Sequence, residues 1–245
     1  MNGLVIIPNV SLLKTNFGLS DATAMDLLNT VDCTIPELAL FGTGCFLWVI
    51  AYGILIRNII VYRRIEMPTV AGCGNFAWEI MYSWFIITDM GSLMLWGYRA
   101  WFFLDIFIWS MLLRYGKEDT FLPPFRKYFI PYSIVLTAVW AAAFWFMKQA
   151  GYETSIGAIS AYLLNTVISV LYVVNFYRVR DREHYSITIA WLKFLGTGLI
   201  SVFMFIHYPD NHFLQLFAVI ITAFDVWYVG LLHAHRRHVV IAYEG

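Results

Sequence analysis

The sequence contains little charge. Only 13% of its 245 residues are Asp, Glu, Lys or Arg, about half of the share in an ordinary soluble domain. Hydrophobic residues make up 60% of the chain and aromatic residues 18%, and the mean hydropathy is +0.68. The apolar residues stand in long blocks rather than in short alternating runs. These features exclude an ordinary soluble fold and indicate an integral membrane protein that crosses the bilayer several times.

Further absences narrow the possible functions. The formal net charge is zero, so the composition gives no reason to expect nucleic acid as a partner. Cys33, Cys45 and Cys73 show no CxxC spacing, which argues against a disulfide framework and against a cysteine metal site. The N-terminus has neither the basic start nor the small-residue cleavage site of a secretory signal. Residues 3–13 are apolar but too short to span a bilayer, so we interpret residues 1–34 as an interfacial extension.

Seven apolar stretches are long enough to cross a bilayer, which takes about 20 residues. Because a chain in lipid must satisfy its own backbone hydrogen bonds, these stretches should be helices. The sequence predicts an all-α membrane protein, with a seven-helix transmembrane domain over residues 35–235 and a cytoplasmic tail over 236–245. Only a break around residues 91–97 separates the second span from the third. The predicted spans are 37–60, 72–93, 96–114, 128–147, 155–177, 187–207 and 213–233.

The positions of Lys and Arg between the spans predict the orientation, because these residues concentrate on the cytoplasmic side. With seven spans and the N-terminus outside, 12 of the 16 Lys and Arg residues fall on the inner side. Lys14, Arg99 and Lys148 fall on the outer side, and Lys193 lies inside a span. An even number of spans would destroy this asymmetry. The sequence therefore predicts an N-terminus outside and a C-terminus in the cytoplasm.

Four ionisable residues from different spans lie at a similar depth in the cytoplasmic half: Glu79, Asp105, Lys193 and Asp225. At 1.5 Å per residue, Glu79 lies about 10 Å and Asp225 about 12 Å from the cytoplasmic ends of their helices. Ionisable residues inside spans are costly and commonly functional. Lys193 fits a snorkelling lysine, and Asp105 fits either a structural acceptor between helices or a site residue. Glu79 and Asp225 have no obvious basic partner between them, which favours a functional role.

Other polar and aromatic residues accompany the two acids. Asn75 lies four residues before Glu79 on the same helix face, where it can orient the acid, and Tyr82 lies one turn further on. Tyr228 follows Asp225 at helical spacing. Aromatic residues are frequent at the same levels, although packing is their commoner role in membrane proteins. The supporting or substrate-binding candidates are Asn75, Phe76, Trp78, Tyr82, Asp105, Trp109, Trp227 and Tyr228.

A carboxylic acid in an apolar pocket keeps its proton at neutral pH. Such an acid suits protonation of an epoxide, or more demandingly an alkene, in a lipophilic substrate. Aromatic faces can stabilise the resulting carbocation, and exclusion of water prevents its early capture. The residues therefore favour acid-initiated carbocation chemistry.

The segment GNFAWEIMY, with Asn75 and Glu79, resembles the asparagine-to-glutamate motif of the small seven-helix integral-membrane terpene cyclases. These enzymes act in fungal meroterpenoid and indole-diterpene pathways and in related bacterial routes. The resemblance continues in FLWVIAYGILIRN, WFFLDIFI and ITAFDVWY. It implies that Glu79 and Asp225 are two essential acids that start cyclisation, without metal or cofactor. The chain also lacks the DDxxD and DxDD patterns of other terpene cyclases, whereas its N-terminal extension departs from the compact fungal pattern.

The resemblance implies a prenylated substrate, of farnesyl type, whose epoxide or alkene is protonated. It leaves open the head group, which acid delivers the proton, the membrane (endoplasmic reticulum if fungal, plasma membrane if bacterial) and the oligomeric state. The alternative is a transporter that uses the acids as a proton relay, although no inverted repeat is visible. A retinal photoreceptor needs a lysine in the last span, and residues 213–233 contain none. The segment HAHRRH at 233–238 fits a basic membrane anchor better than a metal site.

Overall fold

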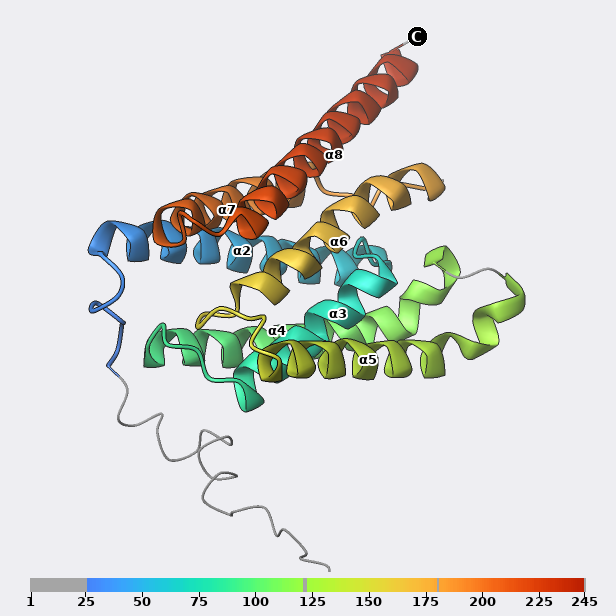
Figure 1. Cartoon of the computed structure of the whole chain (residues 1–245). Coiled ribbons are helices and arrows are strands. Elements are labelled where there is room, and N and C mark those ends of the chain that lie inside the picture. The colour runs from blue at the N-terminus through green and yellow to red at the C-terminus, as the bar shows by residue number, and fades with distance from the viewer. Residues whose placement is uncertain (1–25, 121–122, 180, 245) are drawn as a thin grey trace, which may run out of the picture.

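The computed structural model describes residues 26–120, 123–179 and 181–244, and within these ranges it contains helices and no strand (Figure 1). The predicted all-α fold and the count of seven helices are confirmed. The helices are α2 (Ile35–Tyr62), α3 (Thr69–Ile80), α4 (Ser92–Thr120), α5 (Phe129–Gln149), α6 (Ala158–Arg178), α7 (Ile187–His207) and α8 (His212–Glu244). Two short helices, η1 (Met81–Phe85) and η2 (Pro123–Tyr128), follow α3 and precede α5.

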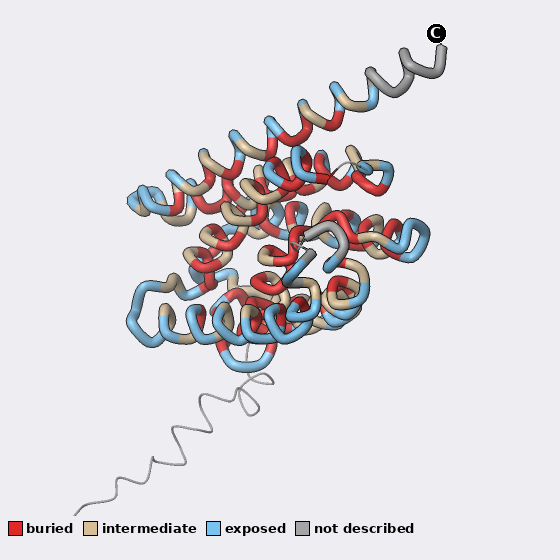
Figure 2. The backbone as a smooth tube through the Cα atoms, turned by 90° about the vertical axis from the view of Figure 1, so that its right-hand side faces the viewer, coloured by how far each residue is buried: buried red, intermediate tan, exposed pale blue. Residues whose placement is uncertain are grey.

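The helices form two packed groups with α6 between them. In one group α2 packs on α7 and α7 packs on α8, while in the other α3 packs on α4 and α5. Helix α6 packs against α8 and also contacts α3, and it crosses between the two groups in Figure 1. Buried residues follow the inward faces of the helices, whereas exposed residues follow the outer faces (Figure 2). Helices α3 and α6 therefore lie where the two groups meet.

Five helical segments are long and apolar enough to cross a membrane: Ile35–Tyr62, Arg126–Gln149, Ala158–Arg178, Ile187–His207 and His212–Arg236. This result supports a multi-pass integral membrane protein. Helix α3, with 12 residues, is too short to qualify alone. The predicted orientation, with the N-terminus outside, stays a prediction.

The predicted second span, 72–93, is wrong in its bounds. The helix begins at Thr69 and α-helical geometry ends at Ile80, where the π-helix η1 continues to Phe85. Residues 86–91 are not helical, and Gly91 has a φ of 95°. Hydropathy does not detect this break because Ile86, Ile87 and Met90 keep the average hydropathy of the segment high, although it also contains Asp89. Glu79 therefore lies in the last turn of a short helix, immediately before a change in helix type.

The third span and the C-terminal segment also differ from expectation. Helix α4 begins at Ser92 rather than at residue 96. The backbone N–H groups of Ser92 and Leu93, in its first turn, donate hydrogen bonds to the carbonyl oxygens of residues 26 and 27. Residues 1–25 of the predicted extension lie outside the described residues. Helix α8 continues to Glu244, so the predicted tail prolongs the last helix and does not form a separate segment, as far as the described residues extend.

Helices α2 and α7 approach closely through two glycines. A Cβ atom added to Gly44 would lie 2.7 Å from the carbonyl oxygen of Gly196, and one added to Gly196 would lie 3.0 Å from the oxygen of Gly44. Small residues permit this backbone contact, which is a common basis of helix association in membranes. The contact fixes the positions of α2 and α7 along one wall of the bundle interior.

Candidate active site

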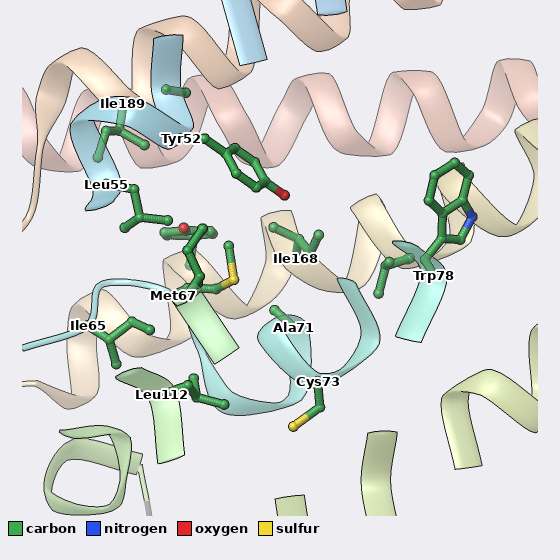
Figure 3. Packing of buried hydrophobic residues seen from close by; sticks show 14 of the residues in the cluster. Tyr52, Leu55, Ile65, Met67, Ala71, Cys73, Trp78, Leu112, Ile168 and Ile189 are labelled. Carbon is green, nitrogen blue, oxygen red and sulfur yellow. The ribbon is translucent and has the colours of Figure 1, made fainter. Parts of the chain in front are cut away.

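A cavity lies in the bundle interior between α2, α3, α4, α6 and α7. It contains about 870 Å³ of empty space, counted together with its opening. Figure 3 shows Tyr52 of α2, Trp78 of α3 and Ile168 of α6, which all contribute to its lining. Helices α5 and α8 contribute no lining residue among those described. Most of the wall is apolar and aromatic, and its rings include Phe41, Trp48, Tyr52, Trp78, Tyr98 and Trp101.

Glu79 contributes the one carboxyl group among the described residues of this lining. Its side chain is only 6% exposed, and Oε2 has no hydrogen-bond partner among the described residues. The Glu79 carboxyl also interacts electrostatically with that of Asp105 from α4. A buried polar atom without a partner is uncommon and needs an explanation. Glu79 thus combines a place in the cavity lining with a carboxyl oxygen that no described group of the protein satisfies.

Asn75 does not orient Glu79, so that prediction is wrong. Its amide nitrogen donates to the hydroxyl of Tyr52 and, at 2.7 Å, to Oδ2 of Asp105. The i,i+4 spacing does place Asn75 and Glu79 on one face, and both line the cavity. Asp105 and Tyr52 approach from α4 and α2 and occupy both donor positions of the amide. The structure therefore brings a second buried carboxyl group beside Glu79, held by Asn75.

Asp225 has a basic partner, contrary to the sequence-based expectation. The ammonium of Lys193 donates to Asp225 Oδ1 at 2.6 Å and to Oδ2 at 2.8 Å. It also donates to Ser169 Oγ at 2.7 Å. Lys193 is buried, so the prediction of a snorkelling lysine is wrong as well. The four ionisable residues thus form two separate pairs, Glu79 with Asp105 and Lys193 with Asp225.

The Lys193–Asp225 pair lies behind one wall of the cavity. The Lys193 ammonium is 5.9 Å from the centre of the Trp48 ring, a cation–π distance. Trp48 lines the cavity, whereas neither member of the ion pair belongs to its lining. The charges of this pair are therefore close to the cavity and separated from it by an aromatic ring.

The predicted aromatic residues fall into different environments. Trp78 lines the cavity, and its indole N–H donates to Ser160 Oγ at 3.0 Å. Tyr82 stacks on Trp78 with ring centres 4.1 Å apart, and its hydroxyl donates to Glu153. Glu153 also accepts hydrogen bonds from the backbone N–H groups at the start of α6. Tyr82 thus supports the wall that Trp78 forms and does not line the cavity itself.

Three predicted aromatic residues lie away from the cavity lining. Phe76 stacks on Trp109 with ring centres 4.9 Å apart, and the indole of Trp109 donates to Thr137 of α5. These contacts join α3 to α4 and α5. Trp227 is 50% exposed and stacks on Phe224 on the outer side of α8. Their observed role is packing.

The predicted site residue Tyr228 binds a glutamate that the sequence analysis did not identify. The Tyr228 hydroxyl donates to Glu66 Oε1 at 2.7 Å, and the backbone N–H of Ser186 donates to Oε2 at 3.1 Å. Glu66 is buried in the loop between α2 and α3, and burial raises the pKa of its carboxyl to about 8. It connects this loop to α8 and to the N-terminus of α7, outside the cavity.

We expect Glu66 to make the protein less stable as pH rises. Its folded pKa of about 8 exceeds the ordinary value of 4.5, so between these values the folded state holds a proton that the unfolded state releases. The free energy of unfolding should therefore fall across this range, by on the order of a few kcal/mol. Thermal melting of detergent-solubilised protein from pH 5 to pH 8.5 measures it. Glu66→Gln should show a smaller decline, and an identical decline in both proteins would contradict the assignment.

We expect Gly157→Ala to destabilise the wall of the cavity. Gly157 has a φ of 80°, and an added Cβ would clash with the Tyr82 ring. Backbone strain and the clash together should lower the free energy of unfolding by about 1–3 kcal/mol. Thermal melting measures the loss. Gly151→Ala is the matched control, because Gly151 also has a positive φ but open space around it. Equal losses would show that contact with Tyr82 is unimportant.

Several cavity residues were not predicted as site residues. Trp48, Tyr52, Tyr98 and Asn165 all contribute to the lining. Asn165 Oδ1 is buried without a hydrogen-bond partner among the described residues, and its amide nitrogen donates to Thr197. Neutral polar and aromatic residues in a span carry no strong individual signal. The spacing of Trp48 and Tyr52, four residues apart on one face, is the pattern that could have indicated them.

Within the described part of the chain, no three His, Cys, Asp or Glu residues are grouped as they would be to hold a metal ion. The absence of metal and cofactor from the reaction stays a prediction.

Comparisons with known proteins identify the family. A family model described as Pyr4-like transmembrane terpene cyclases matches residues 33–235. This match covers α2 to α7 and α8 up to residue 235, and so includes the whole cavity. No curated protein and no solved structure matches the chain. The chain therefore belongs to the Pyr4-like transmembrane terpene cyclases, and it is a membrane-embedded enzyme that cyclises a terpenoid substrate.

Proposed function

We propose that the enzyme starts cyclisation by protonating an epoxide or an alkene of a linear, farnesyl-type prenyl chain, and that Glu79 is the proton donor. The supporting observation is the Glu79 carboxyl group, buried in an aromatic cavity with one oxygen unpartnered among the described residues. A buried carboxylic acid avoids the cost of burying charge as long as it keeps its proton. It can give that proton to a substrate at hydrogen-bonding distance.

The reaction would proceed as a cascade of bond exchanges. The Glu79 proton bonds to the epoxide oxygen or to one alkene carbon, and the C–O bond or the π bond breaks to leave a carbocation. An internal alkene then donates its π electrons to the cation, which forms a ring bond and moves the charge along the chain. Loss of a proton, or addition of a substrate heteroatom, ends the cascade. The rings of Trp78 and Trp101 line the cavity, where they can stabilise the cation.

We propose that Asp105 influences the protonation of Glu79. Its carboxyl interacts electrostatically with that of Glu79, and Asn75 donates to Oδ2. Two negative charges close together in a buried site repel strongly. A proton kept on one of the two carboxyl groups would remove this repulsion, and Asn75 would hold Asp105 in position through its hydrogen bond. This role replaces the predicted contact between Asn75 and Glu79.

We assign Asp225 a different role from Glu79. Its carboxylate is bonded to Lys193 through both oxygens, so it is not free to donate a proton to a substrate in the cavity. It neutralises an ammonium group 5.9 Å from the Trp48 ring. Without Asp225 that positive charge would oppose a carbocation on the other side of Trp48. Asp225 is then a positioning residue that is needed for catalysis because of its charge.

The proposal can be tested in membranes that contain the protein. They are supplied with a farnesyl-type epoxide or the corresponding alkene in the presence of a chelator, and cyclised products are detected by mass spectrometry. Product should form in chelator and should be lost in Glu79→Gln. Full activity of a folded Glu79→Gln protein would refute Glu79 as donor. Loss of activity in chelator, with recovery on adding a divalent metal, would refute a metal-independent reaction. Transport of substrate without covalent change would favour the transporter alternative.

A further inference from the structure

We propose that the prenyl chain reaches Glu79 from the bilayer through an apolar groove between α2 and α4. The inference rests on the proposed function, because it identifies the route by which the substrate of that reaction enters. Most residues that line the groove do not line the cavity, and α7 contributes no described residue to the groove.

The groove adjoins the cavity. Both are lined by Phe41 and Cys45 of α2 and by Met94 and Trp101 of α4. A molecule that slides between these side chains passes from the outer surface of the bundle into the chamber that Glu79 lines. Of the described helices, only α2 and α4 form the sides of the groove, and short stretches at Leu28 and Met90 close one end.

The outer part of the groove faces the position of lipid. Phe46 is 62% exposed and Leu93 is 53% exposed, and they stand on opposite sides of it. Every described residue of its lining is apolar or glycine, apart from the indole N–H of Trp101 and the thiol of Cys45. An ion or a polar head group would find no charged partner there. A hydrocarbon chain, by contrast, exchanges one apolar environment for another.

Two glycines leave the groove open. Gly42 of α2 and Gly97 of α4 both line it, and a Cβ added to either would meet no other atom within 4 Å. Neither glycine has a positive φ, so a larger residue needs no strained backbone at these positions. Glycine is unfavourable in a helix interior by about 1 kcal/mol relative to alanine. Neither backbone conformation nor packing therefore requires glycine at these two positions. Passage of a prenyl chain through the groove would explain why no larger side chain stands there.

Filling the groove should slow the reaction without disturbing the fold. Gly97→Phe and Gly42→Phe place a ring in open space, and we expect kcat/KM for the farnesyl-type substrate to fall by about tenfold or more. Gly53→Phe is the matched control, because Gly53 is also a glycine of α2 with open space around it but lines neither groove nor cavity. Equal activity of Gly97→Phe, Gly42→Phe and Gly53→Phe, with unchanged melting temperatures, would overturn the proposal.

A binding measurement gives a readout that does not depend on turnover. The Glu79→Gln protein in lipid vesicles is irradiated with a farnesyl analogue that carries an alkyl diazirine, and labelled peptides are identified by mass spectrometry. We expect labels on groove residues such as Phe46 and Leu93, competition by excess unlabelled substrate, and loss of label in Glu79→Gln/Gly97→Phe. A palmitoyl diazirine serves as the lipid probe. If it labels the groove equally and substrate does not compete, the occupant is membrane lipid and the proposal is wrong.

The two proposals can fail separately. Wild-type protein that converts no prenyl substrate would refute the proposed function. An active wild-type protein whose rate is unaffected by either groove substitution would refute the route alone.

Discussion

Membranes with the Glu79→Gln variant are expected to form cyclised product about 10² to 10⁴ times more slowly than wild-type membranes, the usual contribution of a general acid. Gln has nearly the same shape as protonated Glu, so the cavity wall should persist, but its amide cannot deliver the proton. The cavity offers no other carboxyl group among the described residues that line it. The loss should therefore appear in the rate of the chemical step, measured by single-turnover product formation.

Glu66→Gln is the matched control for this experiment. Glu66 is another buried glutamate close to α3, but it lies outside the cavity lining and bonds to Tyr228. We expect Glu66→Gln to retain activity near the wild-type level at neutral pH. If both variants lose activity to the same extent, the effect reports a general response to removing a buried acid, and Glu79 has no special role.

Asp225→Asn is expected to inactivate and destabilise the enzyme, and a second substitution at Lys193 should reverse much of the damage. Breaking a buried ion pair from one side typically costs about 3–5 kcal/mol, because the remaining charge is left uncompensated. Lys193 donates to both carboxylate oxygens of Asp225 and to Ser169, so Asp225→Asn leaves a buried ammonium without its counter-charge. Thermal melting and product formation measure the two losses.

The double variant Asp225→Asn/Lys193→Met distinguishes the two possible roles of Asp225. If Asp225 acts by neutralising Lys193, removal of both charges should restore the melting temperature and a substantial part of the activity. If Asp225 donates the initiating proton, the double variant should regain stability but remain inactive. That second outcome would return Asp225 to the catalytic role that the family resemblance implies.

The sequence predicted an all-helical membrane fold because a helix that crosses the bilayer needs a long block of hydrophobic residues, and such blocks are visible in the sequence. It could not locate the end of α3, since Ile86, Ile87 and Met90 keep the average hydropathy of residues 86–91 high and the change to the π-helix η1 leaves no mark in hydropathy. The bounds of α5, α6 and α7 lie close to expectation, where Pro, Gly and charged residues mark the connections. Local composition therefore predicted the ends of these helices well, but it did not predict the break after α3.

The hydrogen-bond and ion-pair partners of the buried polar residues could not be predicted from the sequence. The depth of Lys193 and Asp225 was readable, but depth does not tell which helices are neighbours, and α7 packs directly on α8. Asn75 and Glu79 share a face as their spacing requires. The amide nevertheless bonds to Asp105 and Tyr52, which approach from other helices. Pairings of this kind depend on the arrangement of the helices around the bundle, which no single stretch of sequence contains.

The contact between Gly44 and Gly196 has a consequence for motion. Because the backbones of α2 and α7 approach closely there, and the side chains of Ile200 and Trp48 pack against the same two glycines, the two helices should move as one rigid body. Between α2 and α4, by contrast, Gly42 and Gly97 face open space. Any breathing of the bundle that widens the path to Glu79 should therefore occur by displacement of α4, while the wall of the chamber formed by α2 and α7 stays fixed.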